Sequence, residues 1–466
     1  MKNSRKKIEQ ATAAPTNSQP ILINSFFAGI GGFDLGFQKA GCEPAFHCEI
    51  NEFCQKILKR HWPTVQTASD IREVKSADLP KAQVWCGGFP CQDVSVARGA
   101  MGRQGLKGKN TGLFYPFIQL IGESLPPVVL MENVTGLLSS HSGKDFLTVI
   151  SSLTRLGYGV AWRVFNTRYF GAPQSRPRVY ICAWREDVAK ALSSLYEPGA
   201  THKPGNPRKG FLTSHRCNSS GAVVPEVSYC LAATSGRHTG TDWSRTYISY
   251  AKQVRRLTPV ECEGLQGFPR GWTLPSKSAT DSDEIDTLRY HALGNAVSTP
   301  VVEWVARRIA NTLGNNAATP QATDLFEREV QPSPGQGYED FKGKLARTQR
   351  ISALDAASAS EGFDVKWKTG GYAIGDAIFD AAVSPAPNEP IVSRLIDVIE
   401  KGAVAEHYFL SANAATGILR RVDGQGRELF GPLRDALAAL ASSIARSSEH
   451  RSGSLRGTSD RLAEVV

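Results

Sequence analysis

The sequence predicts an α/β fold built on a doubly wound, Rossmann-like sheet. Between residues 21 and 185, short apolar runs typical of buried strands alternate with segments whose apolar residues recur at helical spacing. The first apolar run leads straight into a glycine-rich turn, and the second leads into a segment that begins with a helix-capping residue. This alternation is the pattern of βαβ units, which assemble into a sheet covered by helices.

The expected strands follow one another in a regular order. The first, residues 21–27, runs into the turn Ala28-Gly29-Ile30-Gly31-Gly32, where glycine permits backbone conformations that other residues avoid. The second, residues 43–49, leads to Asn51, which is suited to cap the helix that follows. Further strands are expected at residues 82–86, 128–131, 160–165 and 178–184.

The second half of the chain is less regular. Between residues 187 and 252, Gly, Pro, Ser, Thr and basic residues replace the apolar periodicity, which indicates a small irregular insertion. Thr299-Pro300 then begins a helix with one apolar face, and Gly314 ends it. The predicted organisation is a flexible tail (1–20), an α/β domain (21–185), the insertion (186–252), a return to the α/β domain (253–314), a linker (315–350), an appended mainly helical region (351–446) and a disordered tail (447–466).

The chain is basic. Its 54 Lys and Arg residues outnumber 44 Asp and Glu residues, which gives a formal charge of +10 and a pI near 9.1. A charge of this sign favours a polyanionic partner such as a nucleic acid. No apolar run approaches the roughly 20 residues that span a bilayer, and the N-terminus lacks the apolar stretch of a secretory signal. We therefore expect a cytoplasmic protein without a membrane partner.

Nine cysteines are scattered along the sequence without the paired CxxC spacing of a zinc site or the density of a disulfide scaffold. Free thiols in a reducing compartment fit this usage best. Cys42, His47, Cys48 and Cys54 are residue types that bind metals. They straddle an expected strand and the helix after it, so their side chains are not expected to converge. The sequence therefore predicts no metal site.

One cysteine lies in a setting that suggests chemistry. Pro90-Cys91-Gln92 follows an expected strand end and precedes the Gly- and Lys/Arg-rich stretch 98–112. A thiol on a rigid turn, with a mobile basic loop beyond it, is what an enzyme needs to attack an extruded nucleobase and to close over it. The alternative is a buried cysteine that acts as a small apolar residue.

The turn 28–32 has features of a nucleoside site, because its glycines let a ligand approach the backbone. Glu49, at the end of the second strand, is placed to bind a ribose hydroxyl pair, and Asp70-Ile71 to contact an adenine edge. Asp34 occupies the position of the third glycine of a dinucleotide site. That departure disfavours NAD and leaves a smaller nucleoside such as S-adenosylmethionine. An ordinary tight turn is the alternative.

Charged residues are expected near the same sheet edge. Glu132 follows the strand 128–131, so it emerges at the carboxyl edge where Cys91 lies and where open α/β sheets bind ligands. A carboxyl group there can act as an acid if burial raises its pKa, and a helix-capping acid is the alternative. Arg176 and Arg178 enter another strand and suit a base oxygen and a phosphate. A solvated pair of surface arginines is the alternative.

Taken in order, these motifs resemble the DNA cytosine carbon-5 methyltransferase family of bacterial or phage type. The similar segments are residues 26–37, 70–71, 87–95, 132–134, 174–178, 256–269 and 294–297. The resemblance implies a methyltransferase sheet whose last helix packs beside the first turn, with a target-recognition region at 186–252. It also implies S-adenosylmethionine as cofactor and double-stranded DNA as partner.

The resemblance implies a role for each motif. Cys91 would add to carbon 6 of a cytosine flipped out of the duplex, and Glu132 would support protonation of ring nitrogen 3. Arg178 would hold the base oxygen and Arg176 a neighbouring phosphate or the basic loop, while Gln92 completes the catalytic set. The cofactor would contact Phe27, Ala28, Gly29, Ile30, Gly31, Gly32, Glu49, Ile50, Asp70, Ile71, Gly88, Pro90, Asn295, Ala296 and Val297.

The recognition region is short for this family. Residues 391–421 resemble a segment that relatives often carry just before that region, but here they lie near the far end of the chain. We expect them either to help bind DNA or to form a helix bundle with a structural role only.

The sequence thus predicts an S-adenosylmethionine-dependent DNA (cytosine-5-)-methyltransferase that flips and methylates a base in a specific duplex site. It is expected to be a monomer associated with the bacterial nucleoid, in a restriction-modification system with a cognate restriction endonuclease. Three alternatives stay open: an RNA cytosine-5 methyltransferase, a nucleotide-dependent oxidoreductase and a non-catalytic DNA-binding regulator. The oxidoreductase gives no reason for Cys91, Glu132 and the two arginines to meet at one sheet edge.

Overall fold

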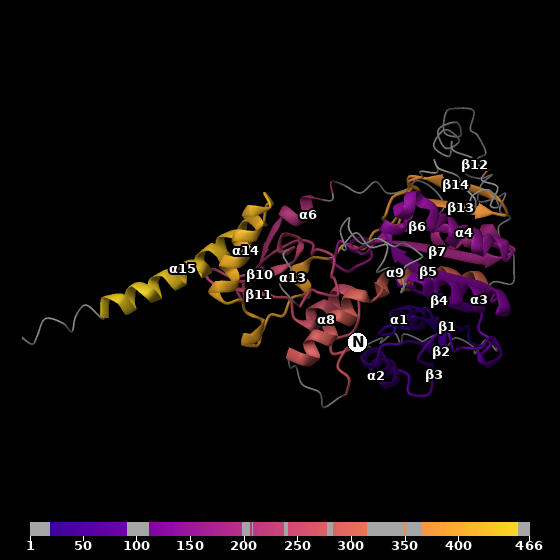
Figure 1. Ribbon diagram of the computed structural model, residues 1–466, viewed down its shortest axis with the longest axis horizontal. Coiled ribbons are helices and arrows are strands. Elements are labelled where there is room, and N and C mark those ends of the chain that lie inside the picture. The colour runs from indigo at the N-terminus through magenta and orange to yellow at the C-terminus, as the bar shows by residue number, and fades with distance from the viewer. Residues whose placement is uncertain are drawn as a thin grey trace, which may run out of the picture.

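The structure is a computed structural model, and it describes residues 19–90, 111–197, 206, 208–236, 241–276, 283–314, 349–350 and 365–454. Figure 1 shows a larger lobe built around a β-sheet and a smaller lobe beside it, from which the long helix α15 (Gly431–Ser454) projects. The C-terminal part of the chain, coloured orange to yellow, contributes strands to the larger lobe and helices to the smaller one.

The larger lobe contains a ten-stranded mixed sheet with the order β12-β14-β13-β6-β7-β5-β4-β1-β2-β3. The five strands β3, β2, β1, β4 and β5 are parallel. The other five pair antiparallel with their neighbours. The strands are β1 (Leu22–Phe26), β2 (Glu43–Cys48), β3 (Gln66–Ala68), β4 (Val84–Gly87), β5 (Val128–Val134), β6 (Tyr158–Asn166), β7 (Pro177–Arg185), β12 (Gln349–Arg350), β13 (Gly370–Ile374) and β14 (Ala377–Ala381).

Helices cover both faces of this sheet, because side chains alternate from face to face along each strand. Val129 and Met131 of β5 join the apolar cluster that includes α3 (Phe114–Ser124) and α4 (Lys144–Arg155). Val128 and Leu130 join the cluster that includes α1 (Gly32–Lys39), α5 (Val188–Leu195) and α9 (Thr299–Gly314). The α/β, doubly wound class predicted from the sequence is therefore confirmed.

The strands and the helix cap expected from the sequence lie close to their expected positions. Each of the six expected strands is present, and the side chain of Asn51 accepts a hydrogen bond from the backbone of Cys54 at 3.0 Å to cap α2 (Glu52–His61). In α9, Val302, Val305 and Ile309 are buried against α1, so the chain does return to the first turn. Only β3 was missed among the parallel strands, since its three largely exposed residues carry no apolar pattern.

The region 351–446 differs from the mainly helical segment that was expected. Its first described part forms β13 and β14, which extend the main sheet beyond β6, and helix appears only from α13 (Leu395–Val398) onward in the described residues. Gly371 faces Trp162, so closely that a Cβ there would lie 2.3 Å from the indole ring. Gly371 and Trp162 lie far apart in the sequence. Two short strands whose packing depends on such a long-range contact give no clear signal in their own sequence. At the far end, α15 continues to Ser454, past the expected start of a disordered tail at residue 447.

The smaller lobe contains a four-stranded antiparallel sheet with the order β11-β10-β9-β8. Its strands are β8 (Ser214–Arg216), β9 (Val223–Pro225), β10 (Tyr247–Ser249) and β11 (Val254–Arg256). One face of this sheet packs on α14 (Ala412–Gly424) and α15, where Tyr247 and Val254 meet Ile418 and Leu437 in one apolar cluster. The insertion is therefore ordered by the C-terminal segment.

The remaining helices of the described residues are three α-helices that follow β7 and several short 3-10 helices. They are α6 (Lys209–Leu212), α7 (Pro259–Gln266) and α8 (Asp283–Asn295), with short 3-10 helices at Ser76–Asp78, Thr111–Leu113, Thr135–Gly143, Thr167–Tyr169, Asp242–Ser244 and Glu406–Tyr408. None of the helices in the described part of the chain is both long enough and apolar enough to cross a membrane.

Candidate active site

The predicted site residues lie on adjacent strand ends. Gly87, the last residue of β4, pairs with Phe26 at the end of β1 and with Met131 near the end of β5. Because these strands are parallel, the glycine turn after β1, the turn after β4 and Glu132 of β5 share one edge of the sheet. The side chain of Asn133 donates a hydrogen bond to the carbonyl of Phe89 at 3.1 Å and so ties β5 to the segment that leads to Pro90.

The glycine turn is tightly enclosed on one side and open on the other. Gly31 has a φ of 80°, and a Cβ there would meet the Trp62 ring at 2.3 Å. A Cβ on Gly32 would meet Val297 at 2.6 Å. Gly29 also has a positive φ, of 56°, but no atom lies within 4 Å of the place of its Cβ. A ligand can therefore approach the backbone at Gly29, while Gly31 and Gly32 let the turn pack against the protein.

Glu49 holds this turn in place through hydrogen bonds. One carboxylate oxygen accepts a hydrogen bond from the backbone N–H of Gly29 at 2.7 Å, and the other accepts one from Asn51 at 2.8 Å. Burial raises the pKa of Glu49, although these backbone hydrogen bonds act to lower it. Ile50 beside it is 62% exposed, which leaves an apolar surface next to the carboxylate.

Asp70 and Ile71 lie beyond β3. The carboxylate of Asp70 is held by the Arg72 guanidinium, whose Nε donates at 2.9 Å, and this hydrogen bond lowers the pKa of Asp70. Ile71 is buried in the main core, with 4% of its surface exposed. Asp34, which stands where a dinucleotide site has glycine, is fully buried with one oxygen 3.1 Å from Nε2 of His47.

Glu132 is buried at the sheet edge, with 7% of its surface exposed. Burial raises its pKa, and the positive charges of Arg178 and Arg176 act in the opposite direction. Nε of Arg178 lies 3.2 Å from Oε1 of Glu132 as an ion pair, although this oxygen accepts no hydrogen bond. A Cβ on Gly88 would lie 3.6 Å from the other carboxylate oxygen, so the turn after β4 runs alongside this acid.

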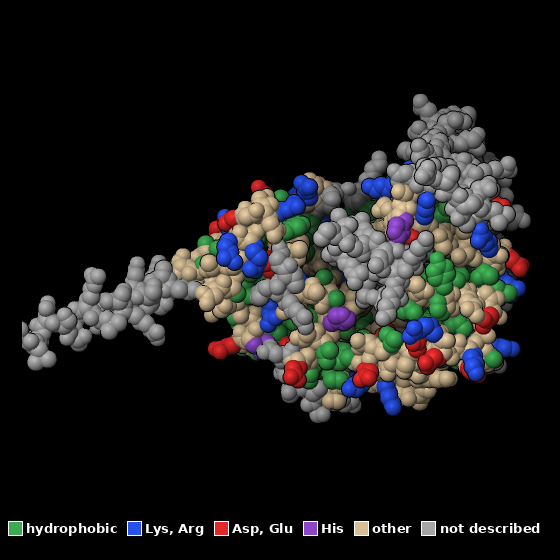
Figure 2. Space-filling model, in the orientation of Figure 1, with side chains coloured by type: hydrophobic (Ala, Val, Ile, Leu, Met, Phe, Trp, Pro, Cys, Tyr) green, Lys and Arg blue, Asp and Glu red, His purple; other side chains and the backbone are tan. Residues whose placement is uncertain are grey.

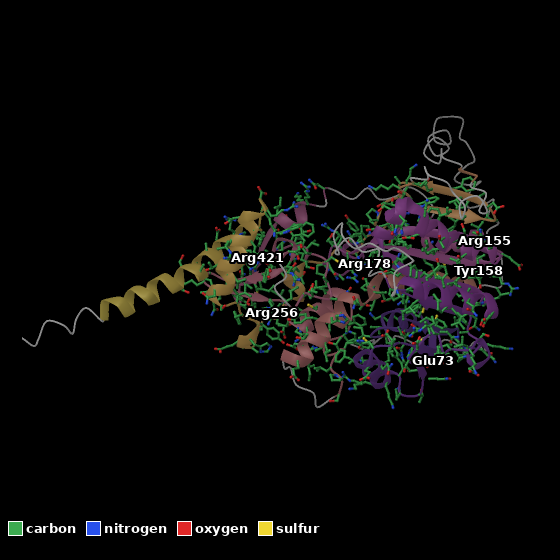
Figure 3. All side chains as sticks on the ribbon, viewed as in Figure 1. Glu73, Arg155, Tyr158, Arg178, Arg256 and Arg421 are labelled. Atoms are coloured by element: carbon green, nitrogen blue, oxygen red, sulfur yellow. The ribbon has the colours of Figure 1, made fainter. Side chains whose placement is uncertain are left out.

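The two arginines of β7 and its approach have different environments. Arg176 is 2% exposed, and its guanidinium donates to the carbonyls of Leu231, Gly294 and Ala296 at 3.0, 3.1 and 2.8 Å. It thus joins the insertion to the segment 294–297. Arg178 lies where the larger lobe meets the smaller one, whereas Arg256 and Arg421 belong to the smaller lobe (Figure 3).

Sequence reasoning missed Cys230, which lies between β9 and β10. Its sulfur accepts from Arg176 at 3.4 Å and from Arg178 at 3.9 Å. Cys230 is an exposed residue. Crowding by protein atoms acts to raise the pKa of its thiol, but the two guanidinium charges outweigh that effect and lower it. Because the arginines lie more than 50 residues earlier in the chain, no local pattern could have linked them to this cysteine.

The segment 295–297 returns to the first turn as expected. Ala296 and Val297 are buried, with Val297 against Gly32 and near Gly88, and Asn295 is exposed. Cys91 and Gln92, with most of the basic stretch 98–112, lie outside the described residues. The structure therefore describes the surroundings of the expected nucleophile and not the nucleophile itself.

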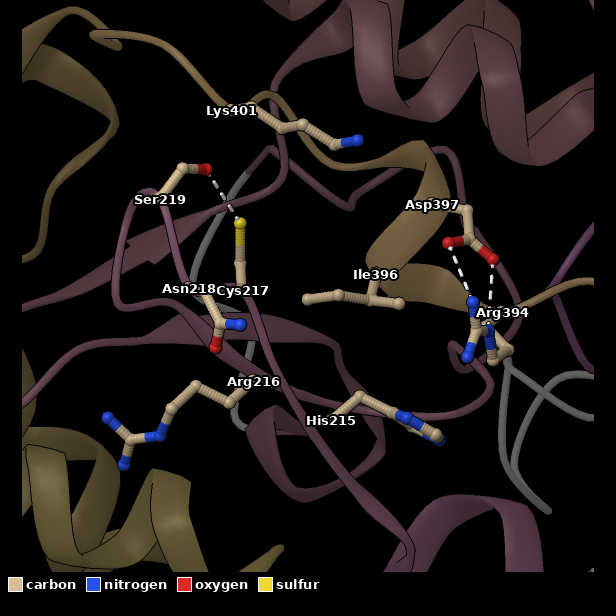
Figure 4. A pocket seen from close by; sticks show the side chains of 9 residues that line it. All are labelled: His215, Arg216, Cys217, Asn218, Ser219, Arg394, Ile396, Asp397 and Lys401. Atoms are coloured by element: carbon tan, nitrogen blue, oxygen red, sulfur yellow. Dashed lines mark hydrogen bonds and ion pairs between the residues drawn. The ribbon is translucent and has the colours of Figure 1, made fainter.

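A separate cavity of about 430 Å³ lies between β8 and α13 (Figure 4). It is lined by His215, Arg216, Cys217, Asn218, Ser219, Arg394, Ile396, Asp397 and Lys401. Hydrogen bonds from Ser219 and Ser220 lower the pKa of Cys217 to about 7. None of the predicted catalytic or cofactor-binding residues lines this cavity, whose walls come from the expected recognition region and from the segment 391–421. On the face shown in Figure 2, Lys and Arg side chains are spread over both lobes among acidic ones and do not form a single stripe.

Several known proteins are similar to this chain in sequence or in fold. The family described as C-5 cytosine-specific DNA methylase matches residues 21–208 and 205–311. The type II methyltransferase M2.BsuMI of Bacillus subtilis is 30% identical over 359 residues, which cover 73% of this chain and 88% of that protein. M.NgoBI of Neisseria gonorrhoeae is 30% identical over 308 residues, covering 62% and 92%. Among solved structures, a methyltransferase of Entamoeba histolytica aligns with a TM-score of 0.48 at 16% identity, over 64% of this chain and 99% of that one.

Proposed function

Because the chain belongs to the C-5 cytosine-specific DNA methylase family and is therefore a DNA (cytosine-5-)-methyltransferase that uses S-adenosylmethionine, we propose that it modifies a specific site in double-stranded DNA with Cys91 as nucleophile and Glu132 as acid. The observation that carries this proposal is the buried Glu132 beside Arg178, at the sheet edge that also bears the glycine turn. The position of this pair at the ligand-binding edge of the sheet distinguishes it from the buried pairs Arg255–Glu261 and Arg289–Glu263 of the described residues.

The proposed reaction begins with addition to the ring. Carbon 5 of cytosine is a poor nucleophile, so the Cys91 thiolate adds to carbon 6, while Glu132 donates a proton toward ring nitrogen 3. The raised pKa of Glu132 supports this role, because more of the carboxyl group then keeps its proton at a given pH. Arg178 holds the base oxygen, and loss of the carbon-5 proton after methylation expels the Cys91 sulfur. The base must leave the duplex first, at a cost of a few kcal/mol.

The residues of the glycine turn fit S-adenosylmethionine, which when bound supplies the methyl group. Gly29 leaves open space beside its backbone, and Glu49 presents carboxylate oxygens from which a ribose hydroxyl pair can donate. The exposed side chain of Ile50 offers an apolar surface to an adenine ring. We assign cofactor binding to these three residues and a supporting role to Ile71, which is buried.

We further propose that the smaller lobe is the target-recognition region and that residues 391–443 are part of it. The apolar cluster that joins β10 and β11 to α14 and α15 supports this assignment, as does the hydrogen bond from the backbone of Leu395 to the carbonyl of Glu226 at 2.8 Å. The recognition region therefore extends beyond residues 186–252. The relatives are named type II methyltransferases, which supports a partner restriction endonuclease.

The proposal is tested by incubating the protein with methyl-labelled S-adenosylmethionine and random-sequence duplex DNA, and then mapping the modified positions. We expect 5-methylcytosine within one short sequence. Transfer RNA is assayed in parallel, because an RNA cytosine-5 methyltransferase would label it in preference to DNA. Label on RNA alone, or on DNA adenine, would contradict the proposal.

A further inference from the structure

We propose that Cys230 is a positioning residue of the methyltransferase site: its sulfur holds the guanidinium group of Arg178 beside Glu132. This inference rests on the proposed function of Glu132 and Arg178. It adds a residue of the insertion, outside the motifs that the sequence analysis singled out, to the machinery of the catalytic lobe.

The contacts of Arg178 define the geometry. Nη1 donates to the carbonyl of Pro177 at 2.8 Å, Nε lies 3.2 Å from Oε1 of Glu132, and Nη2 donates to the sulfur of Cys230 at 3.9 Å. The carboxylate and the sulfur therefore lie at different nitrogens of one planar group. Because a guanidinium group is rigid, contacts at two of its nitrogens determine the direction of the remaining donors. The orientation of the whole group beside Glu132 is set in this way.

Arg176 depends less on the sulfur. It contacts Cys230 at 3.4 Å, but three backbone carbonyls already hold it. Removal of the thiol should therefore affect mainly Arg178. We therefore expect removal of the thiol to impair catalysis. The hydrogen bonds by which Arg176 joins the insertion to the segment 294–297 should remain.

The backbone on either side of Cys230 is held in place. The N–H of Tyr229 donates to the hydroxyl of Thr246 at 2.8 Å, and the N–H of Leu231 donates to the side chain of Gln174 at 2.8 Å. The sulfur is thus presented by a segment with two anchors, one in each lobe. Both arginine charges act to lower the pKa of this thiol, which makes the sulfur a better hydrogen-bond acceptor than an ordinary thiol.

Alkylation tests the contact independently of turnover. The full-length Cys91→Ser variant is treated with iodoacetamide, whose iodide is displaced by the cysteine sulfur as a thioether forms and the thiol proton passes to solvent. Peptide mass spectrometry then gives the rate at each cysteine. We expect Cys230 to react several-fold faster in this variant than after Arg178→Ala is added to it, because loss of the guanidinium charge removes one of the causes that lower the pKa of the thiol, and to be protected by duplex DNA that contains the target site. Equal rates, or no protection by DNA, would overturn the proposal.

Kinetics of otherwise intact enzyme test the positioning role. Cys230→Ala should lower kcat about three- to tenfold, as expected for one lost hydrogen bond in the site, with little change in the KM for S-adenosylmethionine. Cys230→Ser should recover most of that loss, because a hydroxyl can accept the same hydrogen bond. Cys217→Ala is the matched control, since this thiol also lies in the insertion but contacts Ser219 and not an arginine.

Two results would overturn the positioning role: full kcat in Cys230→Ala, or a serine variant as slow as the alanine variant. The turnover of the wild-type enzyme on duplex DNA in the same assay tests the proposed function separately. An active wild type with an equally active alanine variant would leave that function standing and remove Cys230 from it.

Discussion

Glu132 has surroundings that act on its pKa in opposite directions. Burial raises the pKa, and Arg178 and Arg176 act to lower it, with burial the larger effect. A raised pKa keeps the carboxyl group protonated to a higher pH than usual, which suits an acid that donates to a ring nitrogen. The contact with Arg178, whose Nε lies 3.2 Å from Oε1, fixes the position of the carboxyl group beside the guanidinium.

This environment predicts the outcome of Glu132→Gln. The amide cannot donate a carboxylic proton, so single-turnover methylation should slow by about two orders of magnitude or more, while binding of S-adenosylmethionine stays unchanged. In wild-type enzyme the protonated fraction of Glu132 falls as pH rises through its raised pKa. The rate of the addition step should therefore fall on that side of the profile, and this limb should be absent in Glu132→Gln. A variant that keeps both the wild-type rate and the limb would remove Glu132 from the chemistry.

The role of Cys91 leads to a second prediction. Cys91→Ser should keep its affinity for S-adenosylmethionine, because the glycine turn and Glu49 belong to other strand ends. Methyl transfer should be lost, since serine is a far weaker nucleophile than a thiolate at neutral pH. Equilibrium binding and a tritium-transfer assay measure the two properties. Near-normal turnover in this variant would show that another group is the nucleophile.

At the scale of elements, the glycine turn combines a ligand surface with close packing. Gly32 begins α1 and faces Val297 of the returning segment, so the turn and the last helix can approach only if no side chain stands between them. Gly36, one turn later, faces Val302 of α9 in the same way. The cofactor turn is therefore held by a segment more than 260 residues later in the sequence.

Gly32→Ala should consequently destabilise the protein by about 1–3 kcal/mol, the usual cost of forcing extra atoms into a packed site. The Kd for S-adenosylmethionine should rise as the turn shifts away from Val297. Gly402→Ala is the control, because no atom lies within 4 Å of its added Cβ, and it should change stability by less than about 0.5 kcal/mol. Chemical denaturation and calorimetry measure both effects. Equal stability of the two variants would contradict the packing argument.

The sequence identifies the elements better than it identifies their partners. Apart from β3, the strands and capped helices up to β7 follow from the period of apolar residues, and the carboxyl-edge rule places Glu132 at the sheet edge that bears the glycine turn. Cys230 could not be assigned in this way, because its arginine partners lie on a strand far away in the sequence. The hydrogen bonds from Arg176 to three backbone carbonyls could not be predicted from the sequence either, because those carbonyls also lie far from it in the chain.

At the scale of the whole molecule, the C-terminal segment is part of both lobes. Arg163 of β6 is 1% exposed, and two of its donors bind the carbonyls of Ser384 and Ala386 at 3.2 and 2.6 Å. β13 pairs with β6, the strand that carries Arg163, and α14 and α15 cover the smaller sheet. The segment that follows residue 350 therefore supplies two hydrogen-bond acceptors to a buried guanidinium group, which also pairs with Glu197 at 3.8 Å, and covers two apolar surfaces.

Truncation after residue 314 should therefore destabilise the α/β domain itself. Each lost hydrogen bond to a buried charged group typically costs about 1.5–3 kcal/mol, and exposure of the apolar cluster adds to it. We expect little soluble protein, and for any that is recovered a lower midpoint in urea than for full-length chain. Truncation after residue 454 is the control, because it leaves every described element intact. A stable, active protein ending at residue 314 would show that the C-terminal segment is dispensable.

The sequence by itself determined the α/β class, the order of the strands in the chain and the family, because burial period, glycine turns and motif order are local properties of the chain. Only the tertiary structure decided that β13 and β14 extend the main sheet, that α14 and α15 complete the smaller lobe, and that Cys230 lies against Arg178. These contacts join segments far apart in sequence, and their stability comes from surfaces that exist only when both partners have folded.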